Sequence, residues 1–346
     1  MDALSILCTV PGLERAWPGK KGGLVFESRD DEGRLRAGSI GPDGATHLLD
    51  YARDPALPGL TPGLDGELVV HRAGRRAVVV GPGGVRKLLR PGRASMPASQ
   101  ELAQALCSTG LRTAEIREIG HAHIDFELLP GSSLGDLGDA GLPGWRRLAQ
   151  AWGALGRAPG DAHGDLPVHG PAQEAEVLRH WLGRAQEHGV LAGLVEDPRD
   201  LETAVDTACA SLMEDPGELV LAHRDLHEGQ LLWDGTDLSV LDLDTAARAE
   251  AALDLGNLLC HVELMALRGR LSPSAHQRIE GLVEDMAARA PTTRARLAAY
   301  RHASALRLIF VHAFRPTARA WLPQWVQRRL EHTMMNTTKD WSAPCA

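Results

Sequence analysis

The chain has 346 residues, 44% of them hydrophobic, and a formal net charge of −8. This length suits two lobes or domains with a sizeable core, and the hydrophobic content excludes a disordered chain. Basic residues form no separate block and there are only 2 Tyr and 4 Phe, which argues against a nucleic-acid-binding protein. The acidic balance suits a cationic small-molecule partner by long-range attraction.

The sequence contains no run of 18 apolar residues, so no membrane span is expected. The start, Met1-Asp2-Ala3-Leu4, lacks the basic and apolar regions of a signal peptide, and we therefore expect a cytoplasmic protein. Five widely spaced cysteines without a Cys-x-x-Cys pair argue against a disulfide framework or a cysteine-based zinc site. We expect most of them to be buried thiols: Cys8, Cys107, Cys209, Cys260 and Cys345.

Residues 1–63 are predicted to be an N-terminal extension with short strands near 24–28 and 45–49, separated by Gly- and Asp-rich turns. A proline-punctuated linker follows. Residues 64–130 are predicted to form a small lobe in which three strands, a helix and two more strands follow one another. These elements fall at 67–71, 76–80, 85–90, 99–109, 115–120 and 123–129.

Lys87 is one of only four lysines and the only one on a predicted internal strand. Arginine supplies the positive charge almost everywhere else, so a lysine here indicates a role for a compact ammonium group, such as binding phosphates. The alternative is a charge on an edge strand. The turn at 71–75 lacks the pattern Gly-x-Gly-x-x-Gly, and the richer glycines at 81–84 fit a hairpin loop.

Residues 131–346 are predicted to be mainly helical, from the spacing of their apolar residues. The expected helices are 145–155, 174–188, 201–214, 254–267, 274–290 and 294–315. This run is interrupted once, at 219–244. There an apolar strand leads into His223-Arg224-Asp225, Gln230 follows five residues later, and a second strand ends at Asp242.

Phosphoryl transfer needs a carboxylate to orient and deprotonate the attacking hydroxyl, and oxygen ligands for magnesium at the nucleotide phosphates. This segment offers both. Each residue also has a plainer interpretation, since a lone His-x-Asp is often a structural turn and a strand-end Asp a turn former. A second His-x-Asp at 163–165 lies between prolines without flanking strands, and we interpret it as a loop. A zinc pair of His223 and His227 would need Glu where Arg224 stands.

The order and spacing of these motifs resemble the aminoglycoside phosphotransferase family. The resemblance implies an α+β, bilobal protein-kinase-like fold, with a small antiparallel-sheet N-lobe (64–130) and a mainly helical C-lobe (131–346). It further implies ATP and Mg²⁺ as cofactors, Asp225 as the catalytic base, and Gln230 and Asp242 as the metal ligands. Gln230 stands where the family has Asn, and His223 would support the loop by hydrogen bonding.

The resemblance also assigns residues to the nucleotide. Lys87 would contact its phosphates and pair with Glu101, and backbone groups from Glu127 to Leu129 would bind the adenine edge. Asp254 would either cap a helix or hold the catalytic loop, and Asp244 is either a second metal contact or a turn residue. Three further candidates for the substrate pocket follow the metal loop: Glu250, Glu263 and Arg268.

The implied reaction is phosphorylation of a hydroxyl on a small molecule, such as an aminoglycoside, another antibiotic or an amino sugar. A metabolic kinase for choline, homoserine or a sugar would carry the same motifs. A nucleotide-binding but inactive regulator is a different class, favoured by Gln230 and the weak phosphate loop. The presence of Lys87, Asp225 and Asp242 together argues against it.

Overall fold

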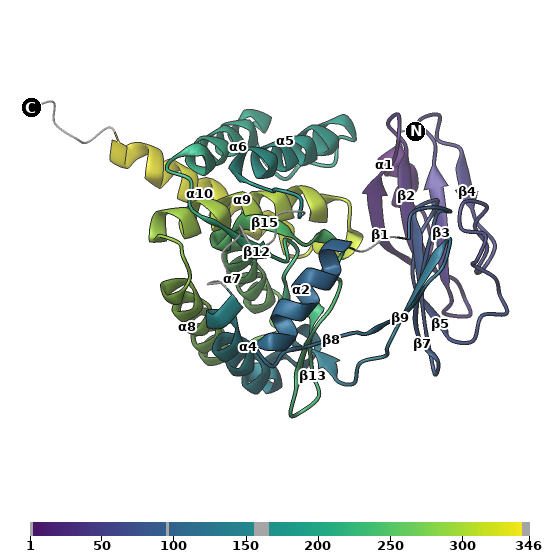
Figure 1. Ribbon diagram of the computed structural model, residues 1–346. Coiled ribbons are helices and arrows are strands. Elements are labelled where there is room, and N and C mark those ends of the chain that lie inside the picture. Colours follow the sequence, from purple (N-terminus) through teal and green to yellow (C-terminus); the bar gives the residue numbers. More distant parts are fainter. Residues whose placement is uncertain (1–2, 95–96, 156–165, 341–346) are drawn as a thin grey trace, which may run out of the picture.

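The computed structural model describes residues 3–94, 97–155 and 166–340. Two antiparallel sheets lie together at one side of the molecule and the helices of the C-lobe at the other (Figure 1). The expected α+β fold with a small sheet lobe and a helical lobe is confirmed. Within the described residues, no helix is long and apolar enough to cross a membrane.

The first sheet belongs to the N-terminal extension and follows chain order. It consists of β1 Leu13–Pro18, β2 Leu24–Arg29, β3 Leu35–Ile40 and β4 Thr46–Leu48, after the short helix α1 Ala3–Leu7. Two of these strands were predicted, and β1 and β3 were not. Gly38 of β3 lies opposite Phe26 of β2, and a Cβ at Gly38 would come within 2.3 Å of the Phe26 ring. This glycine therefore makes room for the aromatic ring in the core.

The second sheet belongs to the predicted N-lobe, with strand order β5-β6-β7-β10-β9 and every neighbouring pair antiparallel. Its elements are β5 Glu67–Arg72, β6 Arg76–Gly81, β7 Gly84–Leu89, β9 Ile116–Ile119 and β10 His123–Phe126, with helix α2 Pro97–Ser108 between β7 and β9. The predicted meander, helix and strand pair are confirmed. Lys87 pairs with Val78 on one side and Ile124 on the other, so it lies on a central strand and not on an edge.

The C-lobe holds the predicted helices, most of which begin a few residues earlier than expected. They are α3 Leu134–Leu137, α4 Leu142–Leu155, α5 Pro171–Glu187, α6 Pro198–Met213, α7 Ala251–Leu267, α8 Pro273–Arg289, α9 Arg294–Ala313 and α10 Leu322–Asp340. Short strands and 3₁₀-helices between α6 and α7 carry the site. They are β12 Leu219–Ala222, η3 Glu228–Gln230, β13 Leu231–Trp233, β14 Leu238–Val240, η4 Leu243–Thr245 and β15 Ala247–Glu250. The remaining elements are β8 Arg112–Thr113, β11 Ser132–Ser133, η1 Gly138–Gly141 and η5 Pro316–Ala318.

The N-terminal sheet shares one hydrophobic core with the C-lobe. Phe26 and Ala16 belong to the same buried cluster as Leu178 of α5, Phe310 of α9 and Trp325 of α10. The extension is therefore packed onto the helices over a large apolar contact, which stabilises both parts.

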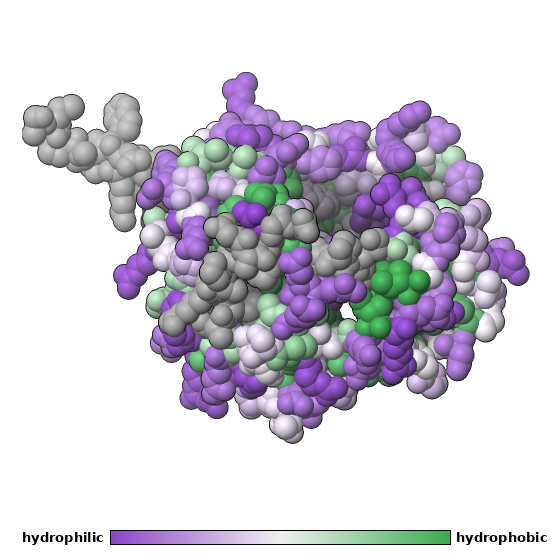
Figure 2. Space-filling model, viewed as in Figure 1, coloured by the Kyte–Doolittle hydropathy of each residue, from purple (hydrophilic) through white to green (hydrophobic). Residues whose placement is uncertain are grey.

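One face of the molecule is mainly polar (Figure 2). Hydrophilic residues (purple) cover most of the face seen in Figure 2, and hydrophobic residues (green) gather in smaller patches. Of the four cysteines that the structure describes, none forms a disulfide; two are buried as expected, and Cys8 and Cys107 are exposed.

Candidate active site

The loop of residues 223–230, called the His-Arg-Asp loop below, begins where β12 ends. His223 is buried and holds the loop through both ring nitrogens. Its Nε2 lies 2.8 Å from the carbonyl oxygen of Leu241, to which it donates, and its Nδ1 accepts the N–H of Asp225 at 3.3 Å. These partners assign the proton to Nε2. The expectation that His223 supports the loop by hydrogen bonding is confirmed.

Asp254, in the first turn of α7, holds the same loop through its carboxylate. Its Oδ2 accepts the N–H of His223 and its Oδ1 the N–H of Arg224, each at 2.7 Å. Arg224 has a left-handed backbone, with φ 70°, so the chain turns sharply at this point. Helix α7 has Glu250 as its N-cap, so of the two expected roles Asp254 has the second, holding the loop. Burial raises the pKa of Asp254 above its ordinary value.

Asn257 is a further support that sequence reasoning missed. Its side-chain amide donates to the carbonyl oxygen of Leu226 at 2.9 Å, and Arg307 donates to its Oδ1 at 2.9 Å. Asn257 is fully buried and lies one helical turn after Asp254. That i, i+3 spacing, which places both on one face of α7, was the signal that could have found it.

The loop of residues 241–245, called the Leu-Asp loop below, follows β14 and faces Lys87. Lys87 Nζ lies 3.1 Å from Oδ1 of Asp242 and also bonds to Oδ2 of Asp244. Burial alone would raise the pKa of Asp242, but the charges of Lys87 and Arg76 outweigh it and hold that pKa below its ordinary value. The structure thus brings together a lysine and two carboxylates from positions 155 and 157 residues apart in sequence.

These residues fit a magnesium ion by the chemistry of their donor groups. Asp242 and Asp244 converge on one cation, Lys87, so their oxygens lie close together. The backbone of Gln230 lies beside them, since its main-chain carbonyl oxygen accepts the N–H of Leu241 at 2.8 Å. Carboxylate and amide oxygens are the ligands that Mg²⁺ prefers in proteins. Asp244 is therefore a candidate metal contact alongside the two predicted ligands.

Glu101 lies on α2, which packs against η4 of the Leu-Asp loop. The Lys87–Glu101 pair stays a prediction, and the structure gives Lys87 the two aspartates as partners. In the segment after β10, the N–H of Glu127 donates to the carbonyl oxygen of Glu115 at 2.9 Å. The Glu127 amide is therefore already hydrogen-bonded within the protein. The predicted adenine contact then depends on the backbone carbonyl of Glu127 and the backbone amide of Leu129.

The β5–β6 turn carries three arginines in place of a glycine-rich phosphate loop: Arg72, Arg75 and Arg76. Asp54, from the linker before the sheet, fixes this turn. Its Oδ2 accepts the N–H of Gly74 at 2.7 Å and lies 3.3 Å from Nε2 of His71. Burial, with the charges of Arg75 and Arg76, lowers the pKa of Arg72 to about 10. The turn therefore places positive charge close enough to the Leu-Asp loop for Arg76 to lower the pKa of Asp242.

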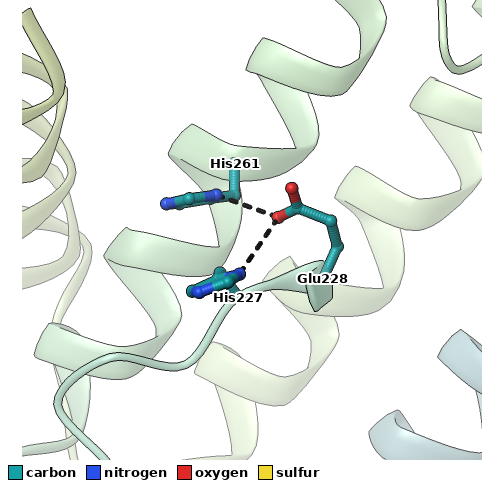
Figure 3. A group of neighbouring side chains, drawn as sticks. All are labelled: His227, Glu228 and His261. Atoms are coloured by element: carbon teal, nitrogen blue, oxygen red, sulfur yellow. Dashed lines mark hydrogen bonds and ion pairs between the residues drawn. The ribbon is translucent and has the colours of Figure 1, made fainter. Parts of the chain in front are cut away.

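Next to Asp225, His227, Glu228 and His261 form a cluster that sequence reasoning also missed (Figure 3). Nδ1 of His261, on α7, lies 2.9 Å from Oε2 of Glu228. Burial alone would raise the pKa of Glu228, but the attraction and hydrogen bond of His261 lower it to about 2. Burial, with His261 as the second cause, lowers the pKa of His227 to about 4, so its ring is neutral near pH 7.

One ligand atom from each of these three residues lies within 4.8 Å of the others, as in a metal site. The two imidazole rings, however, are stacked, with centroids 4.8 Å apart and planes 15° from parallel. A ring nitrogen binds a metal in the plane of its ring, and one ion cannot lie in both of these planes. In this arrangement the three side chains form a hydrogen-bonded and stacked group close to Asp225 in sequence, and they do not form a metal site.

Of the three expected substrate residues, Glu250 is contradicted by the structure. It is 1% exposed, and its carboxylate accepts hydrogen bonds from Arg296, Tyr300 and the N–H of Gly217. Glu263 is bound by arginines of α9 and α10. Arg268 is the C-cap of α7 and is exposed. The second His-x-Asp, at 163–165, lies outside the described residues.

Residues 74–300 match the family model described as "Phosphotransferase enzyme family". Among solved structures, the choline kinase LicA from Streptococcus pneumoniae is 10% identical, with a TM-score of 0.51, covering 79% of this chain and 94% of that one. A choline/ethanolamine kinase family protein from Mesorhizobium loti is 13% identical, with a TM-score of 0.50 and coverages of 81% and 90%. A glucosamine kinase is 17% identical, with a TM-score of 0.49, and covers 98% of both chains. The search of curated proteins finds no match.

Proposed function

Because this chain belongs to the phosphotransferase enzyme family and has a protein-kinase-like fold, we propose that it transfers the γ-phosphoryl group of ATP to a hydroxyl of a small molecule. One observation carries the proposal. Asp225 is held on a loop that His223 and Asp254 fix from two sides, and Lys87 meets Asp242 next to that loop. A base, a phosphate-binding cation and a metal-binding carboxylate are the parts that phosphoryl transfer requires.

In the proposed reaction, Asp225 accepts a hydrogen bond from the acceptor hydroxyl and aligns its oxygen with the γ-phosphorus. As the new P–O bond forms and the bond to the β-phosphate oxygen breaks, the hydroxyl proton passes to Asp225. Lys87 and the arginines of the β5–β6 turn neutralise charge on the phosphates. Mg²⁺, held by Asp242 and Gln230, would supply further neutralisation when bound. Most of the rate gain would come from positioning and electrostatic stabilisation.

The test is acceptor-dependent release of ADP from ATP with magnesium, screened over aminoglycosides, other hydroxylated antibiotics, amino sugars, choline and simple sugars. Asp225→Asn should lose the signal while keeping its circular dichroism and ATP affinity. Asp206→Asn, an exposed aspartate on α6, is the matched control and should behave as wild type.

A folded Asp225→Asn variant with near-normal turnover would contradict the role of that residue. Absence of ATP binding by the wild type would contradict the proposed function itself. ATP binding without transfer to any acceptor would favour the second class, an inactive nucleotide-binding regulator. One observation supports this second class. Nε2 of Gln230 lies 3.4 Å from Nε2 of His227, so the side chain of a predicted metal ligand already has a partner within the protein.

A further inference from the structure

The side chain of Lys87 reaches from the N-lobe to the Leu-Asp loop of the C-lobe. Its ammonium group lies 3.1 Å from Oδ1 of Asp242 and also bonds to Oδ2 of Asp244. The lysine side chain is 10% exposed, and the side chains of the two aspartates are 31% and 32% exposed. Lys87 therefore covers one oxygen of each carboxylate at the place where the two aspartates converge.

The ammonium group of Lys87 occupies the place where a divalent cation would join the two carboxylates. Two carboxylates this close repel each other unless a cation lies between them, and both an ammonium group and Mg²⁺ meet this need. Magnesium binds carboxylate oxygens at about 2.0–2.1 Å. A metal ion on Oδ1 of Asp242 and Oδ2 of Asp244 would put a second cation beside Nζ, because the same two oxygens already bind Nζ. The lysine and the metal ion therefore compete for these oxygens.

Both ends of this contact are fixed by the fold. Lys87 lies on β7, where its backbone is paired with Val78 of β6 on one side and Ile124 of β10 on the other. Asp242 has a left-handed backbone, with φ 52°, a conformation that residues other than glycine seldom adopt and that occurs at functional sites. Helix α2 of the N-lobe packs against η4, which follows Asp242 directly. The contact is therefore not a chance meeting of two flexible surface side chains.

A plainer explanation is that the ion pair only links the two lobes. A buried ion pair is weak evidence for stabilisation, because the cost of removing both charges from water offsets their attraction. A link between lobes also needs only one carboxylate. Here the single positive charge of Lys87 faces the two carboxylates of Asp242 and Asp244, which a divalent cation would balance and one ammonium group does not. The surplus of negative charge favours a metal ion as the second occupant of this place.

The nucleotide of the proposed function gives Lys87 a reason to leave the aspartates. Phosphate groups offer an ammonium group several anionic oxygens, so Lys87 can exchange its carboxylate partners for them without losing a charged partner. The oxygens of Asp242 and Asp244 that it releases are then free for the metal ion that accompanies the phosphates. Each of these two exchanges makes the other more favourable, so the binding of nucleotide and of metal ion is coupled.

We propose that Lys87 closes the metal site of the nucleotide-free protein, so that the divalent cation binds together with the nucleotide and not before it. This inference rests on the proposed function, since it uses the nucleotide that this function requires, and it adds an order of events. Lys87 has two successive sets of partners, first Asp242 and Asp244 and then the phosphates. Removal of the charge of Lys87 must therefore strengthen the binding of a free divalent cation.

The test measures binding of Mn²⁺, a paramagnetic substitute for Mg²⁺, to the full-length protein without nucleotide, by electron paramagnetic resonance. We expect Lys87→Met, which keeps the length of the side chain and removes its charge, to bind Mn²⁺ at least about tenfold more tightly than wild type. Lys87→Gln, neutral but polar, should show the same gain, and circular dichroism checks that both variants are folded. Adding Asp242→Asn to either variant should remove the gained site. Lys20→Met, at an exposed lysine between β1 and β2, is the matched control and should bind Mn²⁺ as wild type does.

Three results would overturn the inference. The first is binding of Mn²⁺ to the nucleotide-free wild type as tight as to Lys87→Met, at a site that Asp242→Asn removes. The second is a folded Lys87→Met and a folded Lys87→Gln without any gain in Mn²⁺ affinity, which would reduce the contact to a link between lobes. The third is a gain that survives Asp242→Asn, which would mean an adventitious ion only. Failure of the wild type to bind a non-hydrolysable ATP analogue with Mg²⁺ would instead overturn the proposed function.

Discussion

Asp254→Asn tests whether the His-Arg-Asp loop depends on a single buried carboxylate. Asp254 is 2% exposed and accepts two N–H groups at 2.7 Å, and hydrogen bonds to a charged group contribute about 1.5–3 kcal/mol each. Asparagine keeps one oxygen as a weaker, neutral acceptor. Its NH₂ group must face the other N–H, which leaves a buried donor unsatisfied at a cost of about 1–3 kcal/mol. We expect the free energy of unfolding to fall by about 2–4 kcal/mol in total.

Three measurements check this expectation. Urea unfolding gives the stability loss, native-state hydrogen exchange gives the opening of the loop, and ADP release gives the activity. The amides of His223 and Arg224 should exchange faster than in wild type, and turnover should fall about a hundredfold or more, because Asp225 follows them directly. Asp285→Asn, on the exposed face of α8, is the control. A variant with less than about 0.5 kcal/mol of destabilisation and unchanged exchange at these two amides would refute the reasoning.

Three further outcomes are expected. Lys87→Arg should raise the KM for ATP and lower kcat, since Lys87 is 8% exposed, its compact ammonium group lies between two carboxylates, and the larger planar guanidinium does not match that geometry. Unchanged steady-state kinetics would contradict this. Phe26→Ala should cost about 3–5 kcal/mol of unfolding free energy, measured in urea, because the ring is buried in the core that joins the N-terminal sheet to the C-lobe. The pKa of Glu228 is lowered to about 2 in the folded protein. Its ionised carboxylate therefore contributes fully to the free energy of unfolding above the unfolded pKa near 4.5, and this contribution is lost as the pH falls from 4.5 towards 2. Its size is about 3 kcal/mol, and Glu228→Gln should flatten the stability profile measured between pH 5 and pH 3; an unaltered profile would show that the cluster with His261 is not the cause.

The candidate base and metal ligands could be proposed from local sequence because Asp225, Gln230 and Asp242 follow one another within about twenty positions. The apolar strand before His223, the spacing to Asp242 and the lysine on a strand are all local signals. Lys87 is the instructive case, since its rarity in a chain rich in arginine pointed to it before any contact was known.

The remaining parts depend on contacts between distant residues. Asp54 fixes the β5–β6 turn from a proline-rich linker, and nothing in that linker indicates a partner 20 residues later. The strands β1 and β3 carry charged and small residues in place of a clear alternation, and they pack against η5 and β5, which are distant in the sequence.

The common core of the N-terminal sheet and the C-lobe also bears on how the chain is made. The hydrophobic core around Phe26 is complete only after Trp325 and its helix α10 have been synthesised. At a synthesis rate of roughly 5–20 residues per second, the interval is about 15–60 s, during which the set of helices that covers the apolar face of the first sheet is incomplete. Domains usually fold one after another as they leave the ribosome. Here a segment that precedes the C-lobe in the chain completes its core only with the last helix of that lobe, so its apolar face stays open to contacts with other proteins in the meantime.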